Sequence, residues 1–222
     1  MSKQGLILTV VKYIVVSSSI FLLTILSLQV TSSLIFLDYF IFSLIALVVG
    51  YLIADFLTGS VHWFCDTFFT ETTPIIGPFI IFSFREHHTH PFLITEDKFI
   101  EQDTTSFFIL LIPLVLSVTA EINYSLNMSD YYTHTLLIGL SIGAFSTNLF
   151  HKWAHMKVPP KFVMKLQNIG LILNHKRHKI HHMNHSKSFC VTSGLLNSFL
   201  DKIKFFQGVE SFIRLFSYER RT

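Results

Sequence analysis

Four apolar stretches constrain this chain more than any other feature of its sequence. They cover residues 6–30, 34–54, 104–122 and 132–150 of the 222-residue chain. Because an α-helix rises about 1.5 Å per residue, each stretch is long enough to cross a hydrocarbon core of about 30 Å. Only 14% of the residues are charged, whereas a soluble domain usually has about 25%. The sequence therefore predicts an integral membrane protein and excludes soluble, disordered and disulfide-rich classes.

The distribution of basic residues predicts how the chain is oriented. Residues 31–33 and 121–131, which connect the stretches in pairs, contain no Lys or Arg. The 17 Lys and Arg residues lie up to Lys12, between Arg85 and Lys98, or after residue 150. The positive-inside rule therefore predicts that both termini and the segment after the second stretch face the cytoplasm. No small-residue cleavage site follows the first stretch, so we expect a retained span rather than a signal peptide.

Together these patterns predict an all-α integral membrane protein with about four transmembrane helices and a cytoplasmic helical cap. Residues 1–54 form an N-terminal transmembrane hairpin, and residues 104–150 form a second one. Residues 55–103 and 151–222 are cytoplasmic or interfacial segments that carry histidine motifs. Within the last segment, residues 162–173 have the apolar period of a helix that lies in the membrane interface.

Histidine is the second unusual feature of the sequence. The chain has 12 His against 9 Gly, and most of the histidines lie in four blocks that follow the predicted hairpins. In the first block, Asp55, His62 and Asp66 share one face of a helix. In the second block, Arg85–His88 places two adjacent imidazoles shortly before Pro91, which ends a helix. Ionisable groups at the end of a span are costly unless they are paired, solvated or bound to metal.

The third and fourth blocks have the spacing of metal-binding helices. His151 and His155 are separated by one helical turn, so both imidazoles can reach one ion, and Asn148 lies one turn earlier. The fourth block offers three imidazoles within about one turn and a fourth shortly after it, at His178, His181, His182 and His185. A single pair of this kind also occurs by chance on helix surfaces. Four such blocks on one membrane face indicate metal binding.

The number and type of these side chains limit the metal. Imidazole with a few carboxylates suits Fe, Zn, Cu or Ni. The candidate ligands are too many for one tetrahedral zinc ion and suit two ions, each with an open position. Two iron ions with open positions can activate O₂ to remove hydrogen from an unactivated C–H bond. A lipid chain is the natural substrate for a site at a membrane face.

In combination, the four blocks resemble those of the Kua/CarF lipid desaturases. The resemblance rests on the segments DFLTGSVHWFCD, FREHHTHP, HKWAH and HKRHKIHHMNHSKSFCVTSGLLN, which occur in this order between Ala54 and Ile203. It implies one lipid desaturase domain over about residues 40–205. The resemblance also implies an oxidoreductase that uses two Fe ions, O₂ and a separate electron donor similar to cytochrome b5 or ferredoxin. In the best-known members, the reaction converts a 1-O-alkyl ether lipid to the vinyl ether of a plasmalogen.

The resemblance assigns roles position by position. It implies nine metal-ligand candidates: His62, His87, His88, His151, His155, His178, His181, His182 and His185. It implies five further site residues that orient the ligands or hold water, Asp55, Asp66, Arg85, Glu86 and Asn148. Three histidines stand where the family pattern has none and are predicted to be spectators: His90, His134 and His175.

Several alternatives remain open from the sequence. An acyl-lipid trans-desaturase or a lipid hydroxylase would use the same kind of site. A zinc-dependent membrane lipid hydrolase would need fewer ligands and a carboxylate acid or base, a role that Glu86 or Asp66 could fill. A metal transporter or sensor would favour ionisable groups in the middle of the spans, where this chain has few.

The expected location follows from the orientation. The site would face the cytoplasm from a bacterial inner membrane or from the endoplasmic reticulum, and its substrate would be a membrane phospholipid. Nothing in the sequence indicates a nucleic-acid partner, and the oligomeric state is left open.

Overall fold

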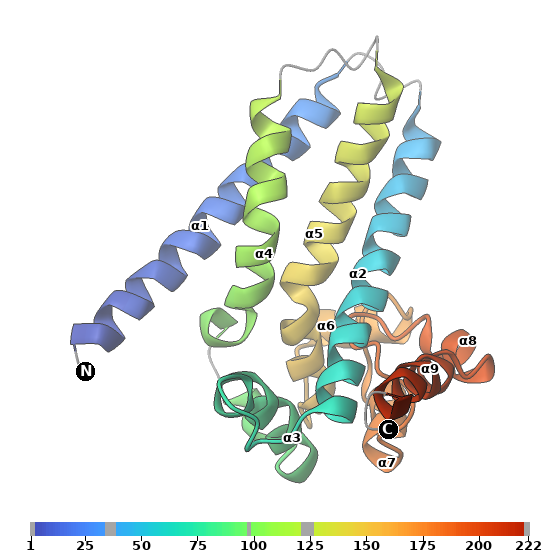
Figure 1. The fold of residues 1–222 in the computed structure, drawn as a ribbon. Coiled ribbons are helices and arrows are strands. Elements are labelled where there is room, and N and C mark those ends of the chain that lie inside the picture. Colours follow the sequence, from blue (N-terminus) through green and yellow to red (C-terminus); the bar gives the residue numbers. More distant parts are fainter. Residues whose placement is uncertain (1–2, 34–38, 97–98, 121–126, 220–222) are drawn as a thin grey trace. The chain divides into compact units, whose positions relative to one another are not determined.

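A computed structural model describes residues 3–33, 39–96, 99–120 and 127–219, and the described residues are helical with no strand (Figure 1). Four long helices match the four predicted stretches: α1 (Lys3–Thr31), α2 (Phe40–Phe68), α4 (Phe99–Thr119) and α5 (Met128–His155). The start of the second stretch, residues 34–38, and the end of the third, residues 121–122, lie outside the described residues. The shorter elements are η1 (Gly77–Ile81), α3 (Phe82–Thr89), η2 (Leu93–Thr95), α6 (Lys161–Asn168), α7 (His175–Met183), α8 (Asn197–Lys202) and α9 (Phe205–Glu219).

The chain divides into two compact units. One comprises residues 1–54 and 97–149, and the other comprises residues 55–96 and 150–222. Helices α2 and α5 run without interruption from the first unit into the second. The first unit therefore contains most of the apolar helical length, and the second contains all four histidine blocks.

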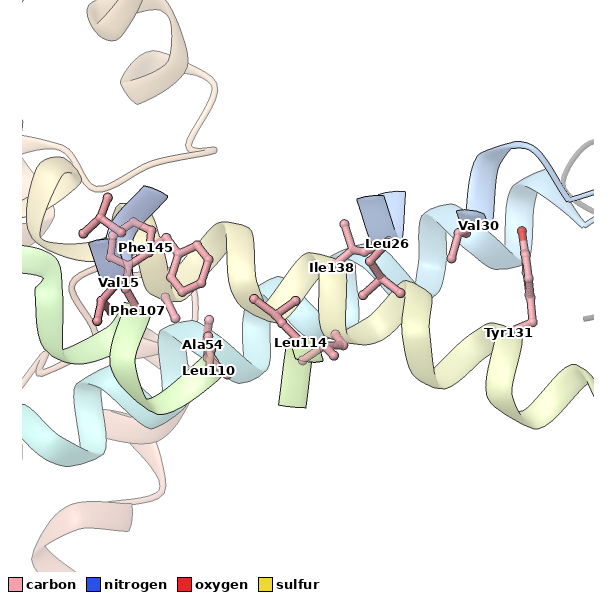
Figure 2. Packing of buried hydrophobic residues seen from close by; sticks show 13 residues of the cluster. Val15, Leu26, Val30, Ala54, Phe107, Leu110, Leu114, Tyr131, Ile138 and Phe145 are labelled. Atoms are coloured by element: carbon pink, nitrogen blue, oxygen red, sulfur yellow. The ribbon is translucent and has the colours of Figure 1, made fainter. Parts of the chain in front are cut away.

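The first unit is held together by apolar side chains between its long helices (Figure 2). Leu26 and Leu114 are fully buried, and the rings of Phe107 and Phe145 stack with centroids 4.0 Å apart. Most of the few buried polar groups there have hydrogen-bond partners, as burial favours. The Tyr131 hydroxyl, for example, lies 2.6 Å from a serine hydroxyl on α2.

The outward sides of the same helices remain apolar. On α4, Phe108, Ile109 and Ile112 are each about two-thirds exposed. Large apolar side chains are also exposed along α1 and α2, among them Phe21 and Ile41. Such continuous apolar surface is unfavourable in water and suits a lipid environment.

Two of the described helices are long and apolar enough to cross a membrane. They are the section of α1 from Gly5 to Thr31 and the whole of α2, and α4 has a shorter apolar section, Thr104–Thr119. The fold is thus all-helical with at least two candidate spans. The full arrangement of four spans remains a prediction from the sequence.

The second unit departs from the sequence pattern in its helix boundaries. Helix α6 ends at Asn168, before the end of the predicted interfacial segment, because the chain turns at Gly170, where φ is +76°. Near the C-terminus, Lys204, whose φ is +52°, separates α8 from α9. Phe206, at the start of α9, is buried in a small aromatic core with Trp63 of α2.

In the first unit, α2 and α5 approach each other closely at glycines. A Cβ atom on Gly139 would lie 2.1 Å from the carbonyl oxygen of Leu47, and one on Gly50 would lie 2.1 Å from that of Leu136. Neither backbone oxygen can move without displacing its helix. Small residues allow this kind of close helix packing in membranes.

Replacement of Gly139 by Ala should therefore separate the two helices and destabilise the protein. The expected cost is about 1–3 kcal/mol, as for other overpacked positions, and it should lower the midpoint of thermal unfolding in detergent. Gly208→Ala is a matched control, because a Cβ there meets no atom within 4 Å. An unchanged midpoint for Gly139→Ala would show that the close approach does not contribute to stability.

Candidate metal centre

Four helices of the second unit bring their histidines together. The histidines come from the C-terminal part of α2, from α3, from the end of α5 and from α7. They form two groups whose ligand atoms lie within 4.8 Å of one another inside each group. The first consists of His62, His87, His88 and His181, and the second of His87, His151, His178 and His182. His87 is common to both groups.

The first group includes a carboxylate. Nε2 of His181 lies 3.1 Å from Nε2 of His88, and the rings of His62 and His181 are 4.5 Å apart. An oxygen of Asp66 is 3.3 Å from Nε2 of His62 and 3.6 Å from Nε2 of both His88 and His181. The sequence predicted Asp66 as a companion of the ligands, and the structure places its carboxylate among them.

The second group converges on one atom. Nε2 of His178 lies 2.9 Å from that of His151, 2.8 Å from that of His155 and 2.8 Å from that of His182. Nε2 of His155 is also 3.2 Å from that of His151. His155 is therefore placed to join this group, as the i, i+4 spacing on α5 predicts.

Hydrogen bonding alone does not account for these contacts. A ring nitrogen carries either one proton or one lone pair, so Nε2 of His178 cannot bond to three other Nε2 atoms at once. Other atoms of the cluster are buried with no hydrogen-bond partner, including Nε2 of His62, Nε2 of His87 and both carboxylate oxygens of Asp66. Buried polar atoms in this state are costly.

A bound cation would remove this energetic cost, because it would accept the lone pairs of these buried nitrogen and oxygen atoms. Imidazole nitrogens about 2.1 Å from one ion lie roughly 3.0–3.4 Å from each other, and most of the contacts above are close to that range. The donor set is imidazole with one carboxylate, which suits iron or zinc rather than a thiolate-preferring metal. The residues present therefore fit two metal ions.

The protonation state of the cluster also suits metal binding. Burial, together with nearby imidazoles, lowers the pKa of His88 to about 3 and that of His182 to about 4, although the Asp66 carboxylate opposes the shift in both. Burial and the adjacent imidazoles hold the pKa of His87 and His178 well below the ordinary histidine value. These side chains are therefore neutral at pH 7, and a metal ligand must be neutral imidazole.

Local structure explains how each helix presents its histidines. Helix α7 is capped at its N-terminus by Asn174, whose side chain accepts a hydrogen bond from the backbone N–H of Arg177. This cap sets the helical register that turns His178, His181 and His182 toward the groups. Arg85 of α3 donates to the backbone carbonyls of Asp66 and Phe69, at the end of α2.

Two predicted companions thus have backbone partners. Arg85 satisfies carbonyl groups that the end of α2 would otherwise leave unpaired. Glu86 contributes its backbone carbonyl, which accepts from Thr89 Oγ1 and from the N–H of His90. Asn148 lies on α5 one turn before His151, in the position that the sequence predicts. Roles in the reaction for these three residues remain predictions.

Asp55 has a different environment from Asp66. It is fully buried, and its carboxylate accepts from the backbone N–H groups of Thr192, Ser193 and Gly194 and from the Ser193 hydroxyl. Four donors stabilise the charged form. Asp55 therefore anchors a loop of the second unit, a structural role that the sequence did not indicate.

The remaining histidines lie outside both groups. His185 is exposed at the edge of the cluster, with its ring 4.3 Å from that of His88. His90 and His175 are exposed, and His134 belongs to the first unit. That His90, His134 and His175 are spectators remains a prediction.

One part of the site could not be recognised from the sequence. Residues 187–194, here called the strap, contact the first group through backbone carbonyls. The carbonyl of Lys187 lies 2.8 Å from Nδ1 of His181, and the carbonyl of Phe189 lies 3.2 Å from Nδ1 of His62. Both contacts are made by backbone carbonyls, and because a backbone carbonyl is present at every residue, no residue type marks them.

Comparison with known proteins identifies the family. The sequence model of the lipid desaturase domain matches residues 51–220. The chain is 34% identical over 169 residues to the plasmanylethanolamine desaturase of Myxococcus xanthus, an alignment that covers 76% of this chain and 59% of that protein. It is 36% identical over 175 residues to plasmanylethanolamine desaturase 1 of Mus musculus, covering 77% of this chain and 65% of the relative.

A plant relative has a different named activity. Fatty acid desaturase 4-like 2, chloroplastic, of Arabidopsis thaliana is 33% identical over 175 residues, with 72% of this chain and 56% of that protein covered. The chain thus spans between about half and two-thirds of the length of these three relatives. No solved structure matches the chain significantly.

This chain therefore belongs to the lipid desaturase domain family, as its histidine blocks predict. The three relatives are all named as desaturases, a class of oxidoreductase.

Loss of one imidazole from the second group should remove one metal ion rather than both. We expect His178→Ala to lower the metal content of the purified protein by about one ion per chain, because three other imidazoles converge on His178. Elemental analysis by mass spectrometry, with helix content as a check on folding, measures this. His90→Ala is the matched control and should leave the metal content unchanged. Equal metal content in both variants would contradict the assignment of the second group.

Proposed function

We propose that this protein is a di-iron, O₂-dependent lipid desaturase that introduces a double bond into a phospholipid-linked chain. The observation that carries the proposal is the pair of histidine groups that share His87. A single zinc ion, as in a hydrolase, would leave one of these groups without a metal. Two ions account for both groups and for their unpaired buried atoms.

The proposed ligands divide between the two groups. His62, His88 and His181 would hold one ion with Asp66, and His151, His155, His178 and His182 would hold the other. His87 lies between them. When bound, two iron ions would supply the oxidation by which O₂, two electrons and two protons take up two hydrogens from neighbouring carbons, giving a double bond and two water molecules.

The protein's own contribution is position and exclusion of water. The ligand rings are mostly buried, and Phe84 and Phe189 pack against the ring of His62 at 5.5 and 6.0 Å. These apolar neighbours keep the reacting region dry.

The most favoured substrate is a 1-O-alkyl ether phospholipid, which would become a vinyl ether. The support for this choice is the similarity to two proteins named plasmanylethanolamine desaturase. An acyl-lipid desaturase is the second candidate, favoured by the similarity to the chloroplastic relative of Arabidopsis. A lipid hydroxylase would use the same residues.

We further propose that α1, α2, α4 and α5 all span the membrane, with the histidine groups on the cytoplasmic side. The support is the exposed apolar surface of the first unit and the absence of Lys and Arg from the segments between paired spans. A bacterial inner membrane or an endoplasmic reticulum would give this orientation. A separate electron donor, similar to cytochrome b5 or ferredoxin, would supply the electrons.

Lipid analysis in a host that lacks vinyl ethers tests the substrate directly. After expression with supplied alkyl-ether lipid, we expect new acid-labile vinyl ether, measured by mass spectrometry before and after acid treatment. His182→Ala should abolish it, because His182 belongs to the second group. His175→Ala, on the same helix but outside the groups, should retain it.

Other lipid products in that experiment would indicate a different activity. A new acyl double bond without vinyl ether would select the acyl-lipid activity, and a hydroxylated chain would select the hydroxylase. Purified protein with one Zn and no Fe per chain would exclude the di-iron desaturase.

A further inference from the structure

The strap contacts two ligands of the same metal group. Its carbonyls at Lys187 and Phe189 face Nδ1 of His181 and of His62. A carbonyl oxygen can only accept, so each imidazole must carry its proton on Nδ1. Nε2 is then left as a lone pair, and in both residues Nε2 is the atom that faces Asp66.

Three side chains from outside the strap hold it in place. Asp201 of α8 accepts from the backbone N–H of Ser188 at 3.0 Å and from its hydroxyl at 2.7 Å. Asn197 accepts from the N–H of Cys190 and donates to its carbonyl, both at 2.9 Å. Asp55 binds the far end of the strap, as described above.

The contact through Asp201 lies between the two strap carbonyls. Ser188 is the residue between Lys187 and Phe189, and its φ is +59°, a conformation that costs energy for a residue other than glycine. The two hydrogen bonds to Asp201 offset this cost. Without them the peptide groups on both sides of Ser188 would lose the orientation that directs their oxygens to the imidazoles.

The second group has a different arrangement. Nδ1 of His178, its central residue, is buried with no hydrogen-bond partner. The strap therefore orients ligands of the first group, whereas the ligand at the centre of the second group has no carbonyl of this kind. A change in the strap would therefore alter the orientation of ligands in the first group and not that of His178 in the second.

We infer that the strap sets the tautomer of His62 and His181 and so controls metal affinity at the first group alone, with Asp201 as a positioning residue. This inference rests on the proposed binding of two metal ions. Outer hydrogen bonds of this kind usually change metal affinity by about 10- to 100-fold. Asp201 carries no ligand atom in either group, so its effect would be indirect.

Titration of the metal-free, full-length protein in detergent with Co²⁺ tests the inference. The wild-type protein should bind two ions. Asp201→Ala should weaken one of them by about 10-fold or more and leave the other unchanged. The weakened ion should be the one that His62→Ala removes, and the unchanged ion should be the one that His178→Ala removes.

Two variants serve as controls. Asp201→Asn keeps the shape of the side chain and can bond to both the N–H and the hydroxyl of Ser188, so it should restore wild-type affinity. Glu210→Ala removes a carboxylate of α9 that pairs with Arg214 and should change neither ion. Ser188→Ala removes only the hydroxyl contact, and it should give a smaller loss at the same ion if Asp201→Ala does not fold.

Specific results would overturn the inference. Two ions bound with wild-type affinity in Asp201→Ala, or equal weakening of both, would show that the strap does not act on the first group alone. A wild-type protein that binds one ion would contradict the proposed function separately. The inference about the strap would then hold only if His62→Ala abolishes binding of that ion and Asp201→Ala weakens its binding.

Discussion

The structure depends on the convergence of neutral imidazoles in a buried space. Each ring must lose its hydration and keep a lone pair that no donor of the protein satisfies, which is unfavourable unless a cation is bound. Ligands from α2, α3, α5 and α7 therefore have to be held together against their tendency to separate. The rest of the second unit is best understood as the support for this cluster.

That support is made largely of backbone groups held by charged side chains. Asp55 binds three successive N–H groups of the strap, and Arg85 binds two carbonyls at the end of α2. Gly59 of α2 allows the strap to pass close by, because a Cβ there would lie 2.7 Å from Sγ of Cys190. These contacts place carbonyl oxygens behind the imidazoles of the first group. A change in the strap can thus affect how His62 and His181 are oriented without a substitution of either histidine.

The family match and the histidine groups lie in the same part of the chain. The family model covers the segment that holds both histidine groups. The apolar helices of the first unit expose large side chains along their length, as expected for a protein that meets its substrate within a bilayer.

The sequence by itself determined the helices and the local ligand pairs. Apolar length predicted α1, α2, α4 and α5, and the 3.6-residue period placed His151 with His155 and His178 with His182, because such contacts depend only on neighbours along one helix. Tertiary structure decided which blocks share a histidine group: His88 meets His181 across 93 positions of sequence. It also decided that Asp55 anchors the strap and that Asp66 joins the ligands. Both are acidic residues on one helix, and only the chain segments packed against each one give it a different role.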